Sequence, residues 1–475
     1  MPNAETAQTA ALTKTLERAL VHAKAFFEGL GERRVGSDLT ADALRRTLGK
    51  PLAERGVDPG QVIDELVRDA DAGLHASVGG RFYAWVLGGS LPAALAADWL
   101  VSVWDQNAGM FAVSPSSAIV EEVAGGWLKD VLRLPEHASF AFVTGCQAAH
   151  TVGLAAARWR VLNRHNWDVE KDGLFGAPSI RIFTSSECHT TVTRAARLLG
   201  MGSGCVEFIP ADDQGRLPPE ALREALKTHA GPKIVVLLAG DLNLGVFDDF
   251  ERLVPIAREA GAWVHVDGAF GLWANASGRR RHLLKGVEAC DSWATDGHKW
   301  LNVPYDSGIA FVADSEAHQA AMTSRASYMM DEGVAREQVD FNPEFSRRAR
   351  GFPIYAALRE LGREGLEAMI DRTSDHCAAI AAGIGALDGA EQLSVPEINQ
   401  ALVRFLDPKP GATEADHARH TDAVIARINA DGEAFFGGVD WRGKRAMRIS
   451  VSCWRTDEAD VALTIEAARE ALAAV

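Results

Sequence analysis

Residues 263–312 read WVHVDGAFGLWANASGRRRHLLKGVEACDSWATDGHKWLNVPYDSGIAFV. The segment begins with a short apolar run that ends at Asp267, and it closes with a second apolar run, GIAFV. Short apolar runs that end at turn-forming residues are typical of buried strands. Lys299 lies between them, flanked by His298 and Trp300. The 32 positions from Asp267 to Lys299 (299 − 267) leave room for one helix-and-strand unit.

The same alternation extends outward over roughly 120–315. Four further runs of strand length come earlier, with helical patterns between them: SFAFVTG (139–145), SIRIFTSS (179–186), CVEFIPA (205–211) and KIVVLLAG (233–240). Strand–helix alternation predicts an α/β fold, with a mainly parallel central sheet and helices on both of its faces. Ligands bind such sheets where the loops leave the C-terminal strand ends.

The two ends of the chain have different patterns. Residues 15–30 and 58–74 carry apolar residues at helical spacing, which predicts an N-terminal helical arm or dimerisation segment over 1–95. After 365 the sequence suggests a helix, two strands and a final helix, with 407–417 as a loop. We therefore predict a large domain over 96–365 and a small C-terminal α/β domain over 366–475.

Composition excludes several classes of function. The net charge of −15 disfavours nucleic acid as a partner. No stretch of about 20 apolar residues is present, so we expect no membrane span. The six cysteines form no C-x-x-C pair, which gives no indication of a zinc site or a disulfide framework. We expect no metal, and a reducing, cytoplasmic setting.

Lys299 and Asp267 are the main candidates for chemistry. Burial between apolar neighbours is expected to lower the pKa of Lys299, which would favour its attack on an aldehyde. A pyridoxal phosphate (PLP) site needs such a lysine and a carboxylate against the pyridine nitrogen. Each residue alone also has an ordinary interpretation, since Asp267 suits a turn or helix cap and lysines are mostly solvated.

Two other loops carry weaker signals at neighbouring strand ends. A strand ends at Gly145 and a helix begins near Gln147, and free N–H groups at such a start attract a phosphate. His189 follows another strand, where a flat imidazole can stack on a cofactor ring. Either feature alone is more often structural.

In combination, these residues resemble the group II PLP-dependent decarboxylases, which have the aspartate-aminotransferase fold (fold type I). The resemblance runs from about residue 81 to the C-terminus. Its most specific part is DGHKW (296–300) with HVDGAFG (265–271) upstream. SSECHTTVTRAARLLG (185–200) and MRISVSCWRTDEAD (447–460) also look like this family.

The resemblance implies a role for each site residue. Lys299 would form the internal aldimine with PLP, Asp267 would pair with the pyridine nitrogen, and a quinonoid would follow loss of CO2 from an L-amino acid. His189 would stack on one ring face and Ala269 would touch the other. The remaining cofactor contacts implied by the family are Gly145, Cys146, Gln147, Asn243 and His298.

A loop tyrosine and a homodimer are also implied. In the resembled enzymes a mobile loop carries a tyrosine that reprotonates the substrate carbon, and Tyr328 is the candidate here. Tyr328 is equally explained as a surface or packing residue. The active sites of this family borrow residues from a partner subunit, so a homodimer with shared sites is expected.

The sequence departs from the family pattern in four places. His150 stands where an asparagine is frequent, and Asp296 stands where Asn often precedes the His-Lys pair. Gly268 interrupts a pair of small residues, and 241–243 replaces a threonine-rich stretch. These departures leave the substrate open.

The substrate class and several alternatives stay open at this level. Apolar residues in pocket-lining segments of the family favour an apolar or aromatic amino acid, or else form a dimer core: Trp85, Leu87, Met110 and Phe111. Three arginines would suit an acidic substrate, or else form salt bridges: Arg325, Arg347 and Arg448. The rival functions are an aldehyde-forming oxidative decarboxylase, an aminotransferase or lyase of the same fold, and a catalytically silent regulatory homologue.

Overall fold

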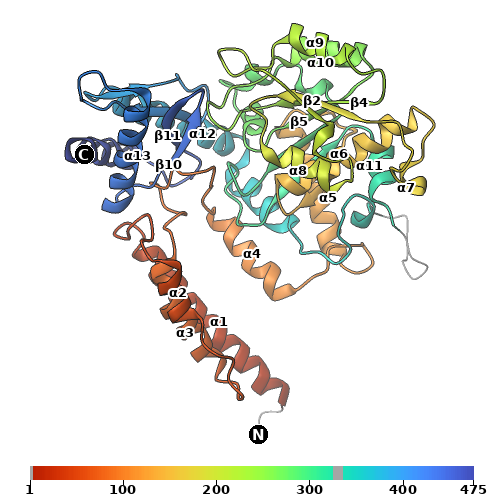
Figure 1. Ribbon diagram of the computed structural model, residues 1–475. Helices are drawn as coiled ribbons and strands as arrows, with labels where there is room; N and C mark the ends of the chain where they lie inside the picture. The colour runs from red at the N-terminus through yellow and green to blue at the C-terminus, as the bar shows by residue number, and fades with distance from the viewer. Residues whose placement is uncertain (1–3, 325–334) are drawn as a thin grey trace.

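The computed structural model describes residues 4–324 and 335–475. An N-terminal arm projects from the rest of the chain, which forms a large domain and a small domain (Figure 1). The arm consists of α1 (Ala4–Glu28), α2 (Ala41–Leu48), α3 (Pro59–Ala70) and η1 (Asp71–Gly73). Within the described part of the chain, no helix combines the length and apolar character needed to cross a bilayer.

The large domain is built on a seven-stranded sheet with the order β1-β7-β6-β5-β4-β2-β3. The strands are β1 (Ser139–Val143), β2 (Arg181–Ser185), β3 (Val206–Ile209), β4 (Lys233–Leu238), β5 (Trp263–Asp267), β6 (Ser292–Asp296) and β7 (Gly308–Val312). Only β7 runs against its neighbours, β1 and β6, and the other pairs are parallel. The expected mainly parallel α/β sheet is confirmed.

Alternate side chains of each strand pack against helices on opposite faces of the sheet. In β4, Val235 and Leu237 join the core formed with α9 (Pro219–Lys227) and α10 (Phe250–Glu259). Ile234 and Val236 join the core formed with α6 (Cys146–Asn163) and α8 (Thr190–Leu198). A strand buried on both faces needs apolar residues at every position, which is why β4 reads as an unbroken apolar run. The other helical elements of this domain are α4 (Pro92–Trp104), α5 (Pro115–Val131), α7 (Val169–Asp172), η2 (Ser203–Cys205), α11 (Ser315–Met322) and η6 (Gln338–Asp340).

Two local details differ from what the sequence suggested. No α-helix lies between Asp267 and Lys299, where the chain forms η3 (Gly271–Ala276), η4 (Arg281–Leu284) and η5 (Val287–Ala289) before β6. The predicted loop over 407–417 ends early because α13 (Glu414–Asp431) begins inside it. Thr413 and Asp416 form a capping box there, which satisfies free N–H groups of the first turn.

The small domain is a four-stranded antiparallel sheet with the order β10-β11-β9-β8. Its elements are β8 (Ala390–Gln392), β9 (Gln400–Phe405), α13, β10 (Gly437–Trp441), β11 (Lys444–Ser450) and α14 (Glu458–Ala474). The long helix α12 (Gly351–Gly385) joins it to the large domain, with a non-helical residue at Gly362. The boundary expected at residue 365 therefore falls inside a helix.

Candidate active site

A pocket of about 240 Å³ lies where five strands of the large sheet end. The loops after β1, β2, β4, β5 and β6 all reach it, because these strands point the same way. Its lining includes every predicted cofactor residue except Asn243: Gly145, Cys146, Gln147, His189, Asp267, Ala269, His298 and Lys299. Glu187, Thr191, Asp241, Leu242, Phe270 and Asp296 line it as well.

Lys299 is held in the pocket by a carboxylate that precedes it by three positions. Its Nζ lies 3.0 Å from Oδ2 of Asp296, whose other oxygen accepts the backbone N–H of Cys146 at 2.5 Å. Desolvation lowers the pKa of Lys299, but the charge of Asp296 and further negative groups outweigh it, so this pKa lies above its ordinary value. The expected lowering of the Lys299 pKa was therefore wrong, because the buried site also contains the Asp296 carboxylate next to the ammonium group.

Asp267 ends β5 and is almost fully buried. Its Oδ1 accepts the backbone N–H of Ala269 at 3.2 Å and lies 3.9 Å from Sγ of Cys146. Its Oδ2 lies 3.5 Å from Nε2 of His150. Burial raises the pKa of the Asp267 carboxyl, but the contact with His150 first, and then the charge of Lys299, hold that pKa below its usual range. The carboxylate is therefore ionised and suited to binding a protonated ring nitrogen.

His189 and Gln147 face the pocket from the starts of two helices. His189 caps α8, and its Nδ1 lies 2.8 Å from the Thr191 hydroxyl. Burial lowers the pKa of His189, which favours a neutral ring. Gln147 donates from its side chain to the Thr191 carbonyl at 3.3 Å, while its Oε1 is buried with no hydrogen-bond partner.

Asn243 does not belong to the wall of the pocket. The Asp241 carboxylate folds this loop by accepting the N–H groups of Asn243 at 2.8 Å, Leu244 at 3.1 Å and Val246 at 2.9 Å. This turn places Asp241 and Leu242 on the pocket side. The pocket wall therefore contains Asp241 and not Asn243, and the cofactor contact that the resemblance implies for Asn243 stays a prediction.

Tyr305 is a neighbour of the site that sequence reasoning did not select. Its ring stacks on His298, with centroids 4.2 Å apart, while 56% of the residue's surface is exposed. His298 in turn accepts the Ser307 N–H at Nδ1, 3.1 Å away. The only sequence signal was position, since Tyr305 follows Lys299 by six residues and is one of four tyrosines.

The sequence matches the family described as "Pyridoxal-dependent decarboxylase conserved domain" over residues 51–406, more than half of the chain. The chain belongs to this family. The family resemblance, the decarboxylase (carboxy-lyase) class and the cofactor expected from the sequence are thereby confirmed.

Relatives of this decarboxylase-family chain are named for different substrates. An aromatic-L-amino-acid decarboxylase from Bacillus atrophaeus is 25% identical over 88% of this chain and 87% of its own. Acidic amino acid decarboxylase GADL1 from Mus musculus is 27% identical over 74% of this chain and 65% of its own. An L-2,4-diaminobutyrate decarboxylase from Rhizobium meliloti (strain 1021) is 30% identical over 66% and 63%. For the last two, the chain spans less than two thirds of the relative's length.

Solved structures confirm the fold of this family member. Oryza sativa TDC with PLP and tryptamine superposes with a TM-score of 0.92 at 22% identity, over 98% of both chains. Mouse CSAD gives a TM-score of 0.90 at 22% identity, also over 98% of both chains.

The arginine candidates differ in their surroundings. Arg347 is buried, pairs with Glu121 at 2.6 Å and donates to two backbone carbonyls, so its role is structural. Arg448, on β11, is buried and outside the pocket lining, and its Nε and one Nη have no hydrogen-bond partner. Burial lowers the pKa of Arg448 to about 10, and Asp241 in the pocket wall opposes that shift. Arg325 and the loop candidate Tyr328 lie outside the described residues.

The apolar residues considered for substrate binding do not line the pocket within the single chain. Trp85 is 59% exposed and stacks on Phe435, and Leu87 packs against a small cluster around Phe82. Met110 and Phe111 are also absent from the lining. Their alternative interpretation, at or near a subunit interface, stays open.

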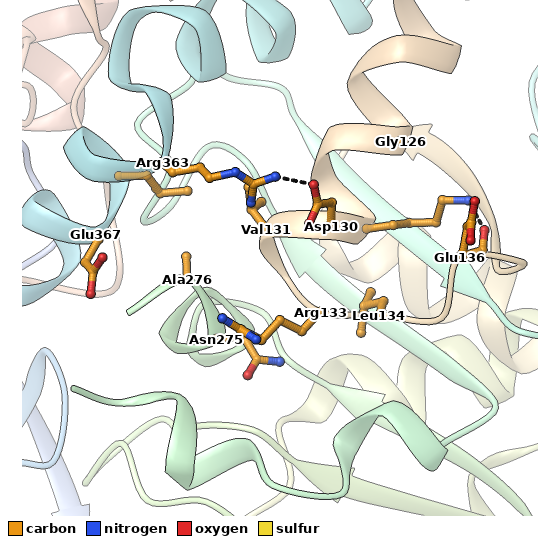
Figure 2. A pocket seen from close by; sticks show the side chains of 12 residues that line it. Gly126, Asp130, Val131, Arg133, Leu134, Glu136, Asn275, Ala276, Arg363 and Glu367 are labelled. Carbon is orange, nitrogen blue, oxygen red and sulfur yellow. Dashed lines mark hydrogen bonds and ion pairs between the residues drawn. The ribbon is translucent and has the colours of Figure 1, made fainter. Parts of the chain in front are cut away.

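A larger hollow of about 850 Å³ lies elsewhere, beside α5, η3 and α12 (Figure 2). Several of its charged side chains have partners: Arg363 pairs with Asp130, and Lys129 donates to the Glu136 carbonyl. Glu367 accepts the Gly278 N–H at 2.7 Å. This hollow holds none of the predicted site residues, so size alone does not identify the active site.

Proposed function

We propose that this chain decarboxylates an L-amino acid to an amine and CO2 in the pocket of Lys299, with PLP as cofactor. The proposal is carried by one observation: Lys299 and the ionised Asp267 line the same small pocket at the strand ends. PLP requires an amine for its aldehyde and an anion for its ring nitrogen, so the residues present fit it. When bound, it supplies an electron-poor ring that accepts the electron pair left as CO2 departs.

The side chains of this pocket would share the remaining tasks. Lys299 would hold the aldehyde and Asp267 would keep the ring-nitrogen proton in place. His189 would cover one ring face, opposite Ala269. We propose Tyr328 as the donor of a proton to the substrate carbon, with His189 and Lys299 as alternatives already on the wall.

Arg448 supports a substrate with an acidic side chain. A buried guanidinium with unsatisfied nitrogens is costly unless an anion binds it. We propose that Arg448, beside the Asp241 wall, binds a carboxylate of the substrate. R448K should therefore raise KM for acidic amino acids at least about tenfold, because lysine lacks the two-pronged donor geometry.

Two rival functions, a sulfur-removing lyase and a catalytically silent homologue, receive less support. A sulfur-removing lyase needs a nucleophilic cysteine, and burial raises the pKa of Cys146 well above its usual value and that of Cys188 to about 12. A silent homologue would have lost Lys299 or Asp267. Oxidative decarboxylation and transamination differ from the proposal in their products.

One experiment tests the reaction and the substrate together. Purified protein with PLP is offered the common amino acids, cysteine sulfinate and 2,4-diaminobutyrate, and amine, CO2, aldehyde, peroxide and 2-oxo acid are measured. We expect amine and CO2 in equal amounts. A protein that takes up no PLP, or that makes aldehyde and peroxide or needs a 2-oxo acid, would contradict the proposal.

We also propose a homodimer in the cytoplasm. Large apolar side chains are exposed on α4 and α5: Trp99, Leu100, Val103, Trp104, Ile119 and Val123. A second copy is the partner that the family resemblance implies for this surface. The six cysteines are all free, in keeping with a reducing compartment. W104K with V103K should shift the sedimentation coefficient from dimer to monomer, and an unchanged dimer would reject this interface.

A further inference from the structure

A line of buried polar side chains runs from Asp267 into the interior of the large domain. Nε2 of His150 lies 3.5 Å from Asp267, and its Nδ1 lies 2.9 Å from Nε2 of His265. Nδ1 of His265 lies 2.7 Å from the Ser292 hydroxyl, which the Trp263 indole contacts at 2.9 Å. The four side chains behind Asp267 have at most 1% of their surface exposed.

The chemistry of the two ends fixes the direction of these hydrogen bonds. Asp267 can only accept, so a neutral His150 carries its proton on Nε2 and accepts at Nδ1 from His265. His265 in turn accepts at Nδ1 from the Ser292 hydroxyl, whose oxygen accepts the Trp263 indole N–H.

The neighbouring charges agree with this direction. Burial lowers the pKa of His265 to about 3, so His265 is neutral and donates from one nitrogen only. Cys146, the other close neighbour of His150, lies 3.4 Å from Nε2. Nε2 of His150 therefore faces two acceptors, Asp267 and the Cys146 sulfur, and each other donor along the line has one. A buried network with every member satisfied holds its side chains rigidly.

We propose that His150 is a positioning residue for Asp267, with His265, Ser292 and Trp263 setting its tautomer. The inference rests on the proposed contact between Asp267 and the cofactor ring. His150 fixes the orientation of the carboxylate and keeps it anionic where burial would otherwise favour its neutral form. The anion then keeps the ring nitrogen of bound PLP protonated.

Two substitutions at one position separate the two contacts of His150. In H150Q the side-chain amide nitrogen can take the place of Nε2 and still donate to Asp267. In H150N the amide takes the place of Nδ1, so it keeps the bond to His265 and loses the one to Asp267. S292A removes the hydroxyl at the far end of the line and keeps both histidines. Melting curves check that all variants fold.

The readout is binding of nitrogen-15-labelled 4′-deoxypyridoxine phosphate to the apo-protein. This analogue has no aldehyde, so its affinity does not depend on the bond to Lys299. We expect wild type and H150Q to bind with similar affinity and a protonated ring nitrogen. H150N should bind about tenfold more weakly, as for other residues that orient a ligand-binding group, and its ring-nitrogen shift should move toward the neutral form. In S292A His265 should change its tautomer, and the nitrogen-15 shifts of its ring should report that change.

The outcomes distinguish this inference from the proposed function. If wild type does not bind the analogue, the cofactor site itself is misplaced. If wild type binds it and H150N matches wild type in affinity and in ring-nitrogen shift, the positioning role of His150 is wrong. Equal losses in H150Q and H150N with normal melting curves would also overturn it, because the retained donor would then make no difference.

Discussion

Two hollows of the large domain, the one beside α5 and α12 and the pocket of Lys299, differ in how their charged groups are arranged. In the larger one, Arg363 and Asp130 pair at the surface, with 65% and 61% of their side chains exposed. In the smaller one, Lys299 and Asp267 lie deep, and only 23% and 10% of their side chains are exposed. The smaller hollow also has an unpartnered oxygen, Oε1 of Gln147.

The comparison teaches that burial of charge, and not volume, identifies a chemical site. Exposed ion pairs are screened by water and contribute about 0–1 kcal/mol. Buried charges shift the pKa values of their neighbours strongly and hold geometry that solvent would otherwise disorder. Substitutions matched between the two hollows therefore test whether this distinction predicts function.

The largest difference is expected between the two lysines. K299A should reduce amine formation by about 10³-fold or more, because no other amine on the pocket wall can bind the aldehyde. It should also abolish the visible absorbance of the PLP-loaded protein, and borohydride should no longer attach PLP to the chain. The matched variant K129A, in the larger hollow, should keep its turnover, and an equal loss in both variants would break the comparison.

The next effect is expected at the aspartates. D267N keeps the shape of the side chain but removes its charge, and should lower kcat/KM about 100-fold by weakening the electron sink. D130N in the larger hollow should change kcat/KM less than about twofold, since its pair is exposed. Steady-state kinetics on the best substrate of the product screen measure both, and near-normal activity of D267N would count against the ring contact.

A smaller effect concerns the pH at which Lys299 becomes reactive. Asp296 raises the pKa of Lys299, so in D296N desolvation should prevail and that pKa should fall by about one unit or more. The free amine then appears at lower pH. Capture of PLP by apo-protein, followed by absorbance across the pH range, should have its midpoint shifted to lower pH. A shift to higher pH would mean that Asp296 does not stabilise the ammonium form.

The smallest effect is expected from the exposed pair alone. R363A should change the free energy of unfolding by less than about 1 kcal/mol and leave turnover unchanged. Thermal denaturation and the amine assay check both. A large loss of turnover would indicate that the larger hollow takes part in function after all.

Much of the central sheet could be predicted because its strands are buried on both faces. The unbroken apolar run of β4 is the clearest example. β6 was not predicted as a separate strand, because its sequence SWATD has polar residues among five buried positions. Its Ser292 and Asp296 are polar because they bond His265 and Lys299. The start of α13 could have been predicted from the capping residues Thr413 and Asp416, but the proline and glycine just before them favoured a loop.

The site residues could be named from motifs, while their electrostatics could not. Lys299 and Asp267 stood out because strand ends gather at one edge of a parallel sheet. The rise in the pKa of Lys299 depends on where one carboxylate points, which spacing alone does not give. The contact of His150 with His265 joins positions 115 apart, and neither residue carries a motif that announces it.

The 35 residues of α12 belong to both domains at once. Leu366 and Met369 lie in the core of the large domain, while Ile380 and Ile384 lie in that of the small domain. Cutting the chain at residue 365 would divide α12 between two fragments and expose apolar side chains of the helix to water in each fragment. The two domains are therefore expected to fold as one unit, because each lacks part of its core without this helix.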